Sequence, residues 1–304
     1  MFYILNILGK YEGGEEDLSE SRSFDISVII GKYPNIAKIF SKEWFESEFN
    51  KKKENMHSLA KQFTFNDEVG VHRHHIEHLE DNLATMWDEI EHKEKHFYEG
   101  LKNKEEYNRT SAEIEIASLL RKMGFQQVEL EPSIPNSEKK GDIKICDADK
   151  EIYIEVSTKK GPEVDYKWDF GPGIQAGTFK FQSQQIYRDK IEHESLQLSE
   201  AHPGIIALYL DPSCIPERRN IGKAFYKWRA WMKDGKIVLL EEGESAMDNT
   251  IISAVLSYFH YYSDGCKILK ELCLNPKAKN PIPNTIISKF REGGIVIYEP
   301  KLLE

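Results

Sequence analysis

The chain has 304 residues, of which 40% are hydrophobic, 11% aromatic and 30% charged, and its formal net charge is −10. This composition excludes a disordered or fibrous protein, because it supports a sizeable core and includes only 19 glycines and 12 prolines. It also excludes a chain coated uniformly with basic charge for nucleic acid, although a local basic groove is compatible with it. At roughly 100–200 residues per domain, the length predicts about two domains.

The acidic charge is concentrated in the first third of the chain. Residues 1–110 contain 15 Lys and Arg against 22 Asp and Glu, whereas residues 111–304 contain 26 against 29. The local balance is therefore −7 up to residue 110 and −3 beyond it. A nucleic-acid partner fits the second part better, and the acidic first part is the less suitable contact surface.

The cysteines and the apolar runs favour a cytoplasmic protein. None of the four cysteines forms a CxxC pair, and their irregular spacing fits neither a zinc site nor a disulfide framework. Residues 1–9 are apolar but resemble a buried strand more than a signal peptide. The longest apolar runs, such as residues 251–259, are shorter than the roughly 20 residues of a membrane helix. We therefore expect no membrane segment.

Residues 1–109 are expected to form a mostly helical module. Between residues 41 and 108 the chain has two glycines and no proline, and helix-forming residues dominate. Leu79, Leu83 and Ile90 recur at the spacing of one helical face.

Residues 110–304 are expected to form an α/β domain. An amphipathic helix over 110–124 opens it, and Gly124 is its stop signal. The expected elements that follow are strands over 125–130, 142–146 and 151–157, a loop over 161–177, a polar helix over 179–199, a strand over 204–210, a helix over 216–232, a strand over 237–240, and a hairpin over 251–262 and 267–274 for which helices are the alternative. The strands on either side of the turn at 147–150 alternate cleanly and form a hairpin.

Three acidic residues stand out by their positions in these elements. Glu113 lies in the first helix, Asp142 opens one hairpin strand, and Glu155 lies in the other. Alternation places Glu155 and Lys159 on one face of their strand, and the hairpin can bring Asp142 beside Glu155. Grouped carboxylates suit a hard cation such as Mg²⁺. Such an ion lowers the pKa of bound water and offsets phosphate charge, and a nearby lysine can position the attacking water.

This set resembles the PD-(D/E)XK nuclease superfamily, which has the restriction-endonuclease-like fold. The resemblance rests on Glu113, on Asp142 after Gly141, and on the run from Glu155 to Lys159, and it covers residues 111–210. It implies a central mixed sheet flanked by helices and a nuclease that uses Mg²⁺ (or Mn²⁺). It further implies that Asp142 and Glu155 are metal ligands and that Glu113 is an outer ligand.

The sequence departs from the superfamily pattern at two positions. Gly141 rather than proline precedes Asp142, and Ser157 stands where the motif has its lysine. Lys159 is one step further along the same face and could substitute. Lys190, in the following polar helix, is the second candidate, because the lysine can migrate to that helix in this superfamily.

Each acidic residue also has an ordinary structural interpretation. Thr110 and Glu113 have the spacing of a capping box, in which the glutamate caps the helix start. Glu115 is the fallback for Glu113, although it is expected to lie more toward solvent. Asp142 could merely begin a strand after a turn, and Glu155 could lie on the solvated face of an outer strand. The joint pattern, in the right element order, favours the metal site.

Histidines form a second possible metal motif. His74 and His78, and again His92 and His96, have the i, i+4 spacing of paired helix ligands. Their neighbours are charged and no metalloprotease glutamate accompanies them. A polar face, solvated or between helices, is therefore favoured over a metal site.

Two basic stretches are candidate nucleic-acid surfaces. The stretch 267–291 has six basic residues against one acidic residue, and 216–233 interleaves aromatics with basic residues. The candidate contacts in the latter are Arg218, Arg219, Lys223, Lys227 and Arg229. An amphipathic helix with a buried aromatic side and a solvated basic side is an equally good interpretation of it.

The resulting hypothesis is a divalent-metal-dependent nuclease that hydrolyses phosphodiester bonds of nucleic acid, with DNA as the expected partner. One alternative is an inactive nuclease-fold protein that binds nucleic acid. Another is a protein-interaction module that acts through the acidic helical region. A homodimer is compatible with all three.

Overall fold

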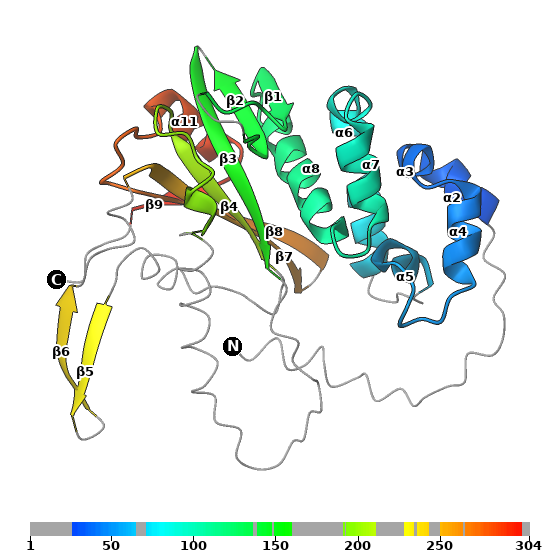
Figure 1. Ribbon diagram of the computed structural model, residues 1–304, viewed down its shortest axis with the longest axis horizontal. Helices are drawn as coiled ribbons and strands as arrows, with labels where there is room; N and C mark the ends of the chain where they lie inside the picture. The colour runs from blue at the N-terminus through cyan, green and yellow to red at the C-terminus, as the bar shows by residue number, and fades with distance from the viewer. Residues whose placement is uncertain are drawn as a thin grey trace.

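The computed structural model describes residues 26–64, 71–135, 139–147, 149–159, 191, 193–210, 228–233, 236–242, 250–263 and 265–299. Over these residues the protein is an α/β fold in which helices pack against one face of a mixed sheet (Figure 1). The expected α/β class is therefore confirmed. No helix in the described ranges is both long enough and apolar enough to span a bilayer.

Short helices make up the N-terminal part of the described chain. They are α2 (Ile26–Lys32), α3 (Pro34–Ile39), α4 (Lys42–Phe49) and α5 (Ser58–Thr64). Three of them, α3, α4 and α5, have a local reason to begin where they do. Pro34 opens α3 at a position that needs no backbone donor. Ser41 Oγ accepts the Trp44 N–H at 3.3 Å to cap α4, and His57 Nδ1 accepts the Leu59 N–H at 3.1 Å at the start of α5.

Three longer helices connect this part to the sheet. They are α6 (Val71–Ile90), α7 (Glu94–Lys102) and α8 (Tyr107–Lys122). The expected helical face of α6 is confirmed, because Leu79, Leu83 and Ile90 are all buried. Helix α6 also caps α3, since Glu80 accepts the Asn35 N–H at 3.0 Å. The short helices α3 and α5 thus contact α6, and α6 in turn packs against α8.

The sheet combines two hairpins with two parallel central pairs. Its strands are β1 (Gln127–Leu130), β2 (Ile143–Asp147), β3 (Lys150–Lys159), β4 (Gly204–Leu210), β7 (Ile252–Ser263), β8 (Gly265–Leu274) and β9 (Val296–Tyr298), in the spatial order β1-β2-β3-β4-β7-β8-β9. Strands β1, β2 and β3 are antiparallel, β3–β4 and β4–β7 are parallel, and β7–β8 is antiparallel. Both expected hairpins are confirmed, and β4 is the expected buried strand.

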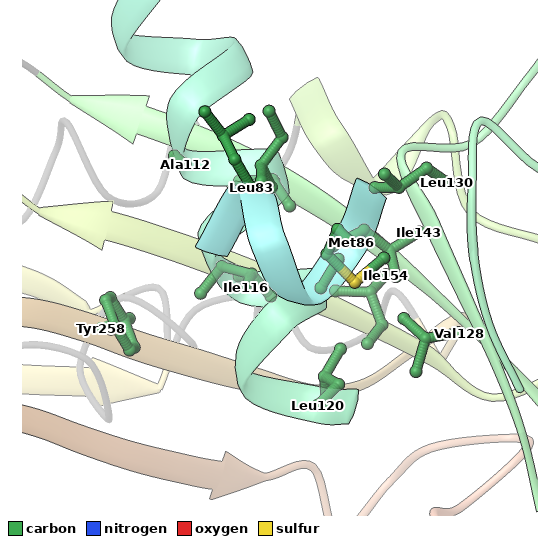
Figure 2. Packing of buried hydrophobic residues seen from close by; sticks show 14 of the residues in the cluster. Leu83, Met86, Ala112, Ile116, Leu120, Val128, Leu130, Ile143, Ile154 and Tyr258 are labelled. Atoms are coloured by element: carbon green, nitrogen blue, oxygen red, sulfur yellow. The ribbon is translucent and has the colours of Figure 1, made fainter. Parts of the chain in front are cut away.

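Helix α8 is the centre of the core. It packs against β1, β2 and β3 on one side and against α6 and α7 on the other. Ile116 and Leu120 of α8 belong to the same buried cluster as Leu83 of α6 and Ile154 of β3, and all four are fully buried (Figure 2). Because α8 is covered on both sides, polar residues on it are buried as well, including Glu113 and Glu115.

The region after β4 departs from the sequence-based expectation. Residues 228–232 belong to strand β5 (Trp228–Lys233), not to a helix, and β5 pairs antiparallel with β6 (Lys236–Glu242) in a separate two-stranded sheet. The helix expected over 216–232 is therefore wrong at its C-terminal end. The sequence signal for a hairpin is Asp234-Gly235 between the two strands, because Asp-Gly is a strong hairpin-turn dipeptide.

Other expectations fall partly or wholly outside the described residues. These are the strand over 1–9, the loop over 161–177, most of the helix over 179–199 and the helix over 216–227. Helix α11 (Asn284–Glu292) was not expected, and it buries Ile286 and Phe290. The proposed division at residue 110 stays a prediction. Helix α8 begins at Tyr107, and one hydrophobic cluster contains residues from both sides of that position.

Candidate active site

Helix α8 and the β2–β3 hairpin place three acidic residues close to one another. Glu113 comes from α8, Asp142 directly precedes β2, and Glu155 lies in β3. The register pairs Ile143 with Ile154, so Asp142 stands beside Glu155. The Val156 N–H donates to Asp142 Oδ2 at 2.7 Å and holds that carboxylate against β3.

Glu155 is fully buried, and no donor among the described residues reaches either of its oxygens, so the only hydrogen bond described for it is the one that its protonated form makes with Asp142. Burial raises its pKa to about 10, and the negative charge of Asp142 adds to the effect. The carboxyl group therefore keeps a proton unless a cation lies beside it. This is the strongest chemical signal in the site.

Gly141 allows the chain to pass close to this carboxylate. A Cβ at position 141 would stand 3.1 Å from Glu155 Oε1, which is tighter than ordinary contact. Glycine at position 141 thus has a local steric reason. Any side chain at 141 would press on Glu155.

Arg109 joins Glu113 to Asp142. Its Nε donates to Glu113 Oε1 at 2.9 Å and its Nη2 donates to Asp142 Oδ1 at 3.1 Å. His96 approaches the other oxygen of Glu113, with Nε2 3.1 Å from Oε2. This contact is the main reason that the pKa of His96 is raised, whereas burial is the main reason that the pKa of Glu113 is raised. Sequence reasoning missed Arg109, although its place one turn before Glu113 is a usable signal.

The capping interpretation of Glu113 is wrong. Thr110 lies inside α8, three residues after its first residue Tyr107, and is not at the N-cap. The Glu113 carboxylate binds Arg109 and His96 rather than backbone N–H groups at the helix start. The side chain instead faces the end of the β2–β3 hairpin.

The backbone next to Asp142 is unusual. Glu131 has a φ of 48°, in the left-handed region that few side chains adopt. Its N–H donates to the Asp142 carbonyl at 2.9 Å, and its Oε1 lies 3.5 Å from His96 Nδ1. Strained residues of this kind gather at functional sites.

Position 157, where the superfamily motif has its lysine, holds a serine that binds another carboxylate. Ser157 Oγ donates to Glu194 Oε1 at 3.1 Å, so a fourth carboxylate lies near Glu155 and further raises its pKa. Lys159 is the last residue of β3, and its side chain lies outside what the structure describes. Lys190 also lies outside the described residues. Among the described residues, Arg109 is the cationic side chain that contacts Asp142.

Most basic side chains of the two candidate nucleic-acid surfaces are either outside the described residues or bound within the fold. Arg218, Arg219, Lys223 and Lys227 lie outside the described residues, and Arg229 lies in β5 with an undescribed side chain. In the second stretch two lysines bind within the fold. Lys270 donates to the Gly293 carbonyl at 3.1 Å, and Lys289 binds Asp147 at 2.5 Å.

A second polar cluster surrounds Glu115, which is buried and does not face solvent as expected. Its carboxylate contacts two histidines and two tyrosines: His78, His260, Tyr209 and Tyr258. Burial acts to raise its pKa, but the hydrogen bonds and charges of His260 and His78 outweigh burial and hold that pKa well below its usual range.

The two clusters differ in their fit to a metal ion. Among the described residues, only His78, Glu115 and His260 bring three possible ligand atoms within 4.8 Å of one another, so this cluster could hold a metal. At the other cluster, two adjacent carboxylates, Asp142 and Glu155, offer oxygen donors, and Glu113 is held apart by Arg109. Oxygen donors with room for waters suit Mg²⁺.

Comparison with known proteins leaves the family open. No protein-family model and no curated protein matches the chain. Among solved structures, the chain is similar to SfsA from Pyrococcus furiosus in complex with Ca²⁺, at 11% identity and a TM-score of 0.21. The similarity covers 54% of this chain and 60% of the SfsA chain.

Proposed function

We propose that the protein is a divalent-metal-dependent nuclease, in which residues 110–304 form a restriction-endonuclease-like domain behind a helical module of residues 1–109. The observation that carries the proposal is Glu155, whose buried carboxylate lies beside that of Asp142 and receives no hydrogen bond from a donor among the described residues. Such a pair of carboxylates needs a proton or a cation. A divalent cation answers that need in the way the superfamily resemblance implies.

In this proposal Asp142 and Glu155 hold Mg²⁺ (or Mn²⁺), and Glu113 assists as an outer ligand. An ion bound there would supply a water of lowered pKa and would offset charge on the phosphate. The Val156 N–H orients Asp142, and Arg109 fixes Glu113 relative to Asp142.

The attacking water needs a further positioning group. Lys159 or Lys190 would support it, and neither side chain is described. Arg109, with its side chain half exposed, is a third group that could meet phosphate charge.

DNA is the proposed substrate, and the cytoplasm the proposed location. The near-neutral charge of residues 111–304 leaves room for a polyanion, whereas the acidic residues 1–110 would repel it. Arg218, Arg219, Lys223, Lys227 and Arg229 remain the proposed contacts to the phosphate backbone. A homodimer would allow two strands to be cut.

A second candidate is an inactive nucleic-acid-binding protein on the same fold. The contact between Ser157 and Glu194 favours it, because a lysine is replaced by a hydroxyl that binds another carboxylate. Such a protein would still bind the phosphate backbone through its basic residues but would not cleave it.

Cleavage assays separate the two candidates. Purified protein is incubated with plasmid and single-stranded DNA in Mg²⁺, in Mn²⁺ or in a chelator, and DNA binding is measured in parallel. We expect metal-dependent cleavage that falls at least about 100-fold in Asp142→Asn and Glu155→Gln. The matched control is Glu151→Gln, which removes a partly exposed carboxylate from the same strand and should cleave normally. DNA binding without cleavage by the wild type would favour the second candidate.

A further inference from the structure

The cluster around Glu115 brings together three elements that are distant in sequence. His78 comes from α6, Glu115 from α8 and His260 from β7. His78 Nε2 and His260 Nε2 each lie 2.7 Å from Glu115 Oε1. Glu115 and His260 are buried, and the His78 side chain is 19% exposed.

Two tyrosines hold the carboxylate from the sheet side. Tyr258 donates to Glu115 Oε1 at 2.5 Å and Tyr209 donates to Oε2 at 3.0 Å. These tyrosines are register partners in β4 and β7, and their rings stack 5.5 Å apart. The orientation of Glu115 is therefore fixed by groups other than the histidines.

The donors around Glu115 exceed what one oxygen can accept. A carboxylate oxygen has about two lone-pair sites, yet His78, His260 and Tyr258 all converge on Oε1. Two imidazole nitrogens and this carboxylate oxygen lie within 4.8 Å of one another, as the ligands of a single metal ion do. The 2-His-1-carboxylate set suits a transition metal rather than Mg²⁺.

We propose that His78, Glu115 and His260 form a binding site for Zn²⁺ that is separate from the proposed cleavage site. Zinc–ligand distances of about 2.0–2.1 Å place tetrahedral ligands roughly 3.3 Å apart. The nitrogens therefore need to withdraw by only about 0.6 Å from Oε1 to admit the ion. Tyr209 and Tyr258 then keep the glutamate in its binding orientation, as outer hydrogen bonds do at zinc sites.

His74 borders the site, and its ring would have to move to become a fourth ligand, because its nitrogens lie outside the group of ligand atoms within 4.8 Å of one another. Its ring stacks on that of His78 at 5.5 Å and lies 5.9 Å from that of His260. Its Nε2 is buried and has no hydrogen-bond partner among the described residues. Four protein ligands would make the site closed, and a closed zinc site has a structural role.

The position of Glu115 explains what such a site would stabilise. Glu113 and Glu115 are two residues apart on α8, which places them about 200° apart around the helix axis. The zinc site therefore lies on the other side of α8 from Asp142 and Glu155. It would link α6 and α8 to strand β7 and fix the helical layer on the sheet.

Zinc titration of the whole chain tests the proposal. Calorimetry measures Zn²⁺ stoichiometry, and visible absorption of the Co²⁺-loaded protein reports tetrahedral nitrogen and oxygen ligation. We expect the wild type to bind one Zn²⁺ per chain, and we expect His78→Ala and His260→Ala to bind it at least about 100-fold more weakly. Addition of Zn²⁺ should raise the unfolding temperature of the wild type but not that of either variant. His92→Ala is the matched control, because the His92 side chain is 79% exposed and contacts only Glu91 among the interactions described for it.

The outcomes keep this site distinct from the proposed active site. Asp142→Asn should bind Zn²⁺ like the wild type even though it loses cleavage. Absence of Zn²⁺ binding by the wild type, unchanged binding in His78→Ala, or a loss confined to Asp142→Asn would overturn the proposal. His78→Ala decides the test if His260→Ala does not fold, because the His78 side chain is partly exposed.

Discussion

Glu115 and Glu155 are both buried glutamates, and the two differ in what surrounds their oxygens. Glu115 accepts hydrogen bonds from two histidines and two tyrosines, and its pKa is lowered. Glu155 has no donor among the described residues and lies beside the carboxylate of Asp142, and its pKa is raised to about 10. Burial alone thus says little about the role of a carboxylate. A glutamate with partners contributes to the fold, whereas one without partners requires a proton or a cation.

Removal of the Glu115 carboxylate should have the largest effect on stability. Glu115→Ala leaves buried donors on His78, His260 and Tyr258 without their shared acceptor. We expect a loss of about 3–5 kcal/mol in the free energy of unfolding, measured by urea titration. The control Glu129→Ala removes a surface ion pair with Lys144 and should cost about 0–1 kcal/mol. Equal losses of stability in Glu115→Ala and Glu129→Ala would contradict the structural role of the buried Glu115 carboxylate.

Glu155→Gln should act in the opposite direction in metal-free protein. Folded Glu155 keeps its proton up to a pH of about 10, whereas the unfolded chain loses it above the usual pKa of 4.5. The folded state binds more protons between these values, so its stability falls as the pH rises through this window. At pH 8 the variant should exceed the wild type by at least about 1 kcal/mol, since one pKa unit corresponds to about 1.4 kcal/mol.

The pH profile of that difference sharpens the prediction. Urea titrations of both proteins at pH 5 to 9 should show the advantage of Glu155→Gln growing with pH, and Mg²⁺ should reduce it by stabilising the wild type. A difference that does not change with pH would mean that Glu155 is not held in its protonated form.

Gly141→Ala should produce the smallest effect. Its methyl group would stand 3.1 Å from Glu155 Oε1 and press on the carboxylate. We expect a loss of about 1 kcal/mol in stability and several-fold weaker Mn²⁺ binding, measured by urea titration and calorimetry. Gly31→Ala is the control, because a Cβ there has no atom within 4 Å. Unchanged Mn²⁺ affinity in Gly141→Ala would place the ion away from Glu155.

The local patterns in the sequence were enough to predict much of the fold. Alternation around residues 147–150 predicted the β2–β3 hairpin, and the apolar run over 204–210 predicted β4. The spacing of Leu79, Leu83 and Ile90 predicted α6. The helix expected over 216–232 is wrong over 228–232, where the interleaved basic and aromatic residues lie in strand β5.

The candidate site could be predicted only in part, for physical reasons. Asp142 and Glu155 are close in sequence and joined by a hairpin, so their adjacency follows from local structure. The partners of Glu115 come from positions 78, 209, 258 and 260, and only the tertiary fold brings them together. Its expected exposure was wrong because α8 is covered on both sides, which no single-helix pattern reveals.

The most direct test of the proposed function is a crystal structure of the protein soaked in Mn²⁺, with the ion located by its anomalous scattering. We predict an ion between the carboxylates of Asp142 and Glu155, with the Val156 N–H still bound to Asp142. Carboxylates that lie far apart, or that hold no ion in the soaked crystal, would contradict the proposed active site.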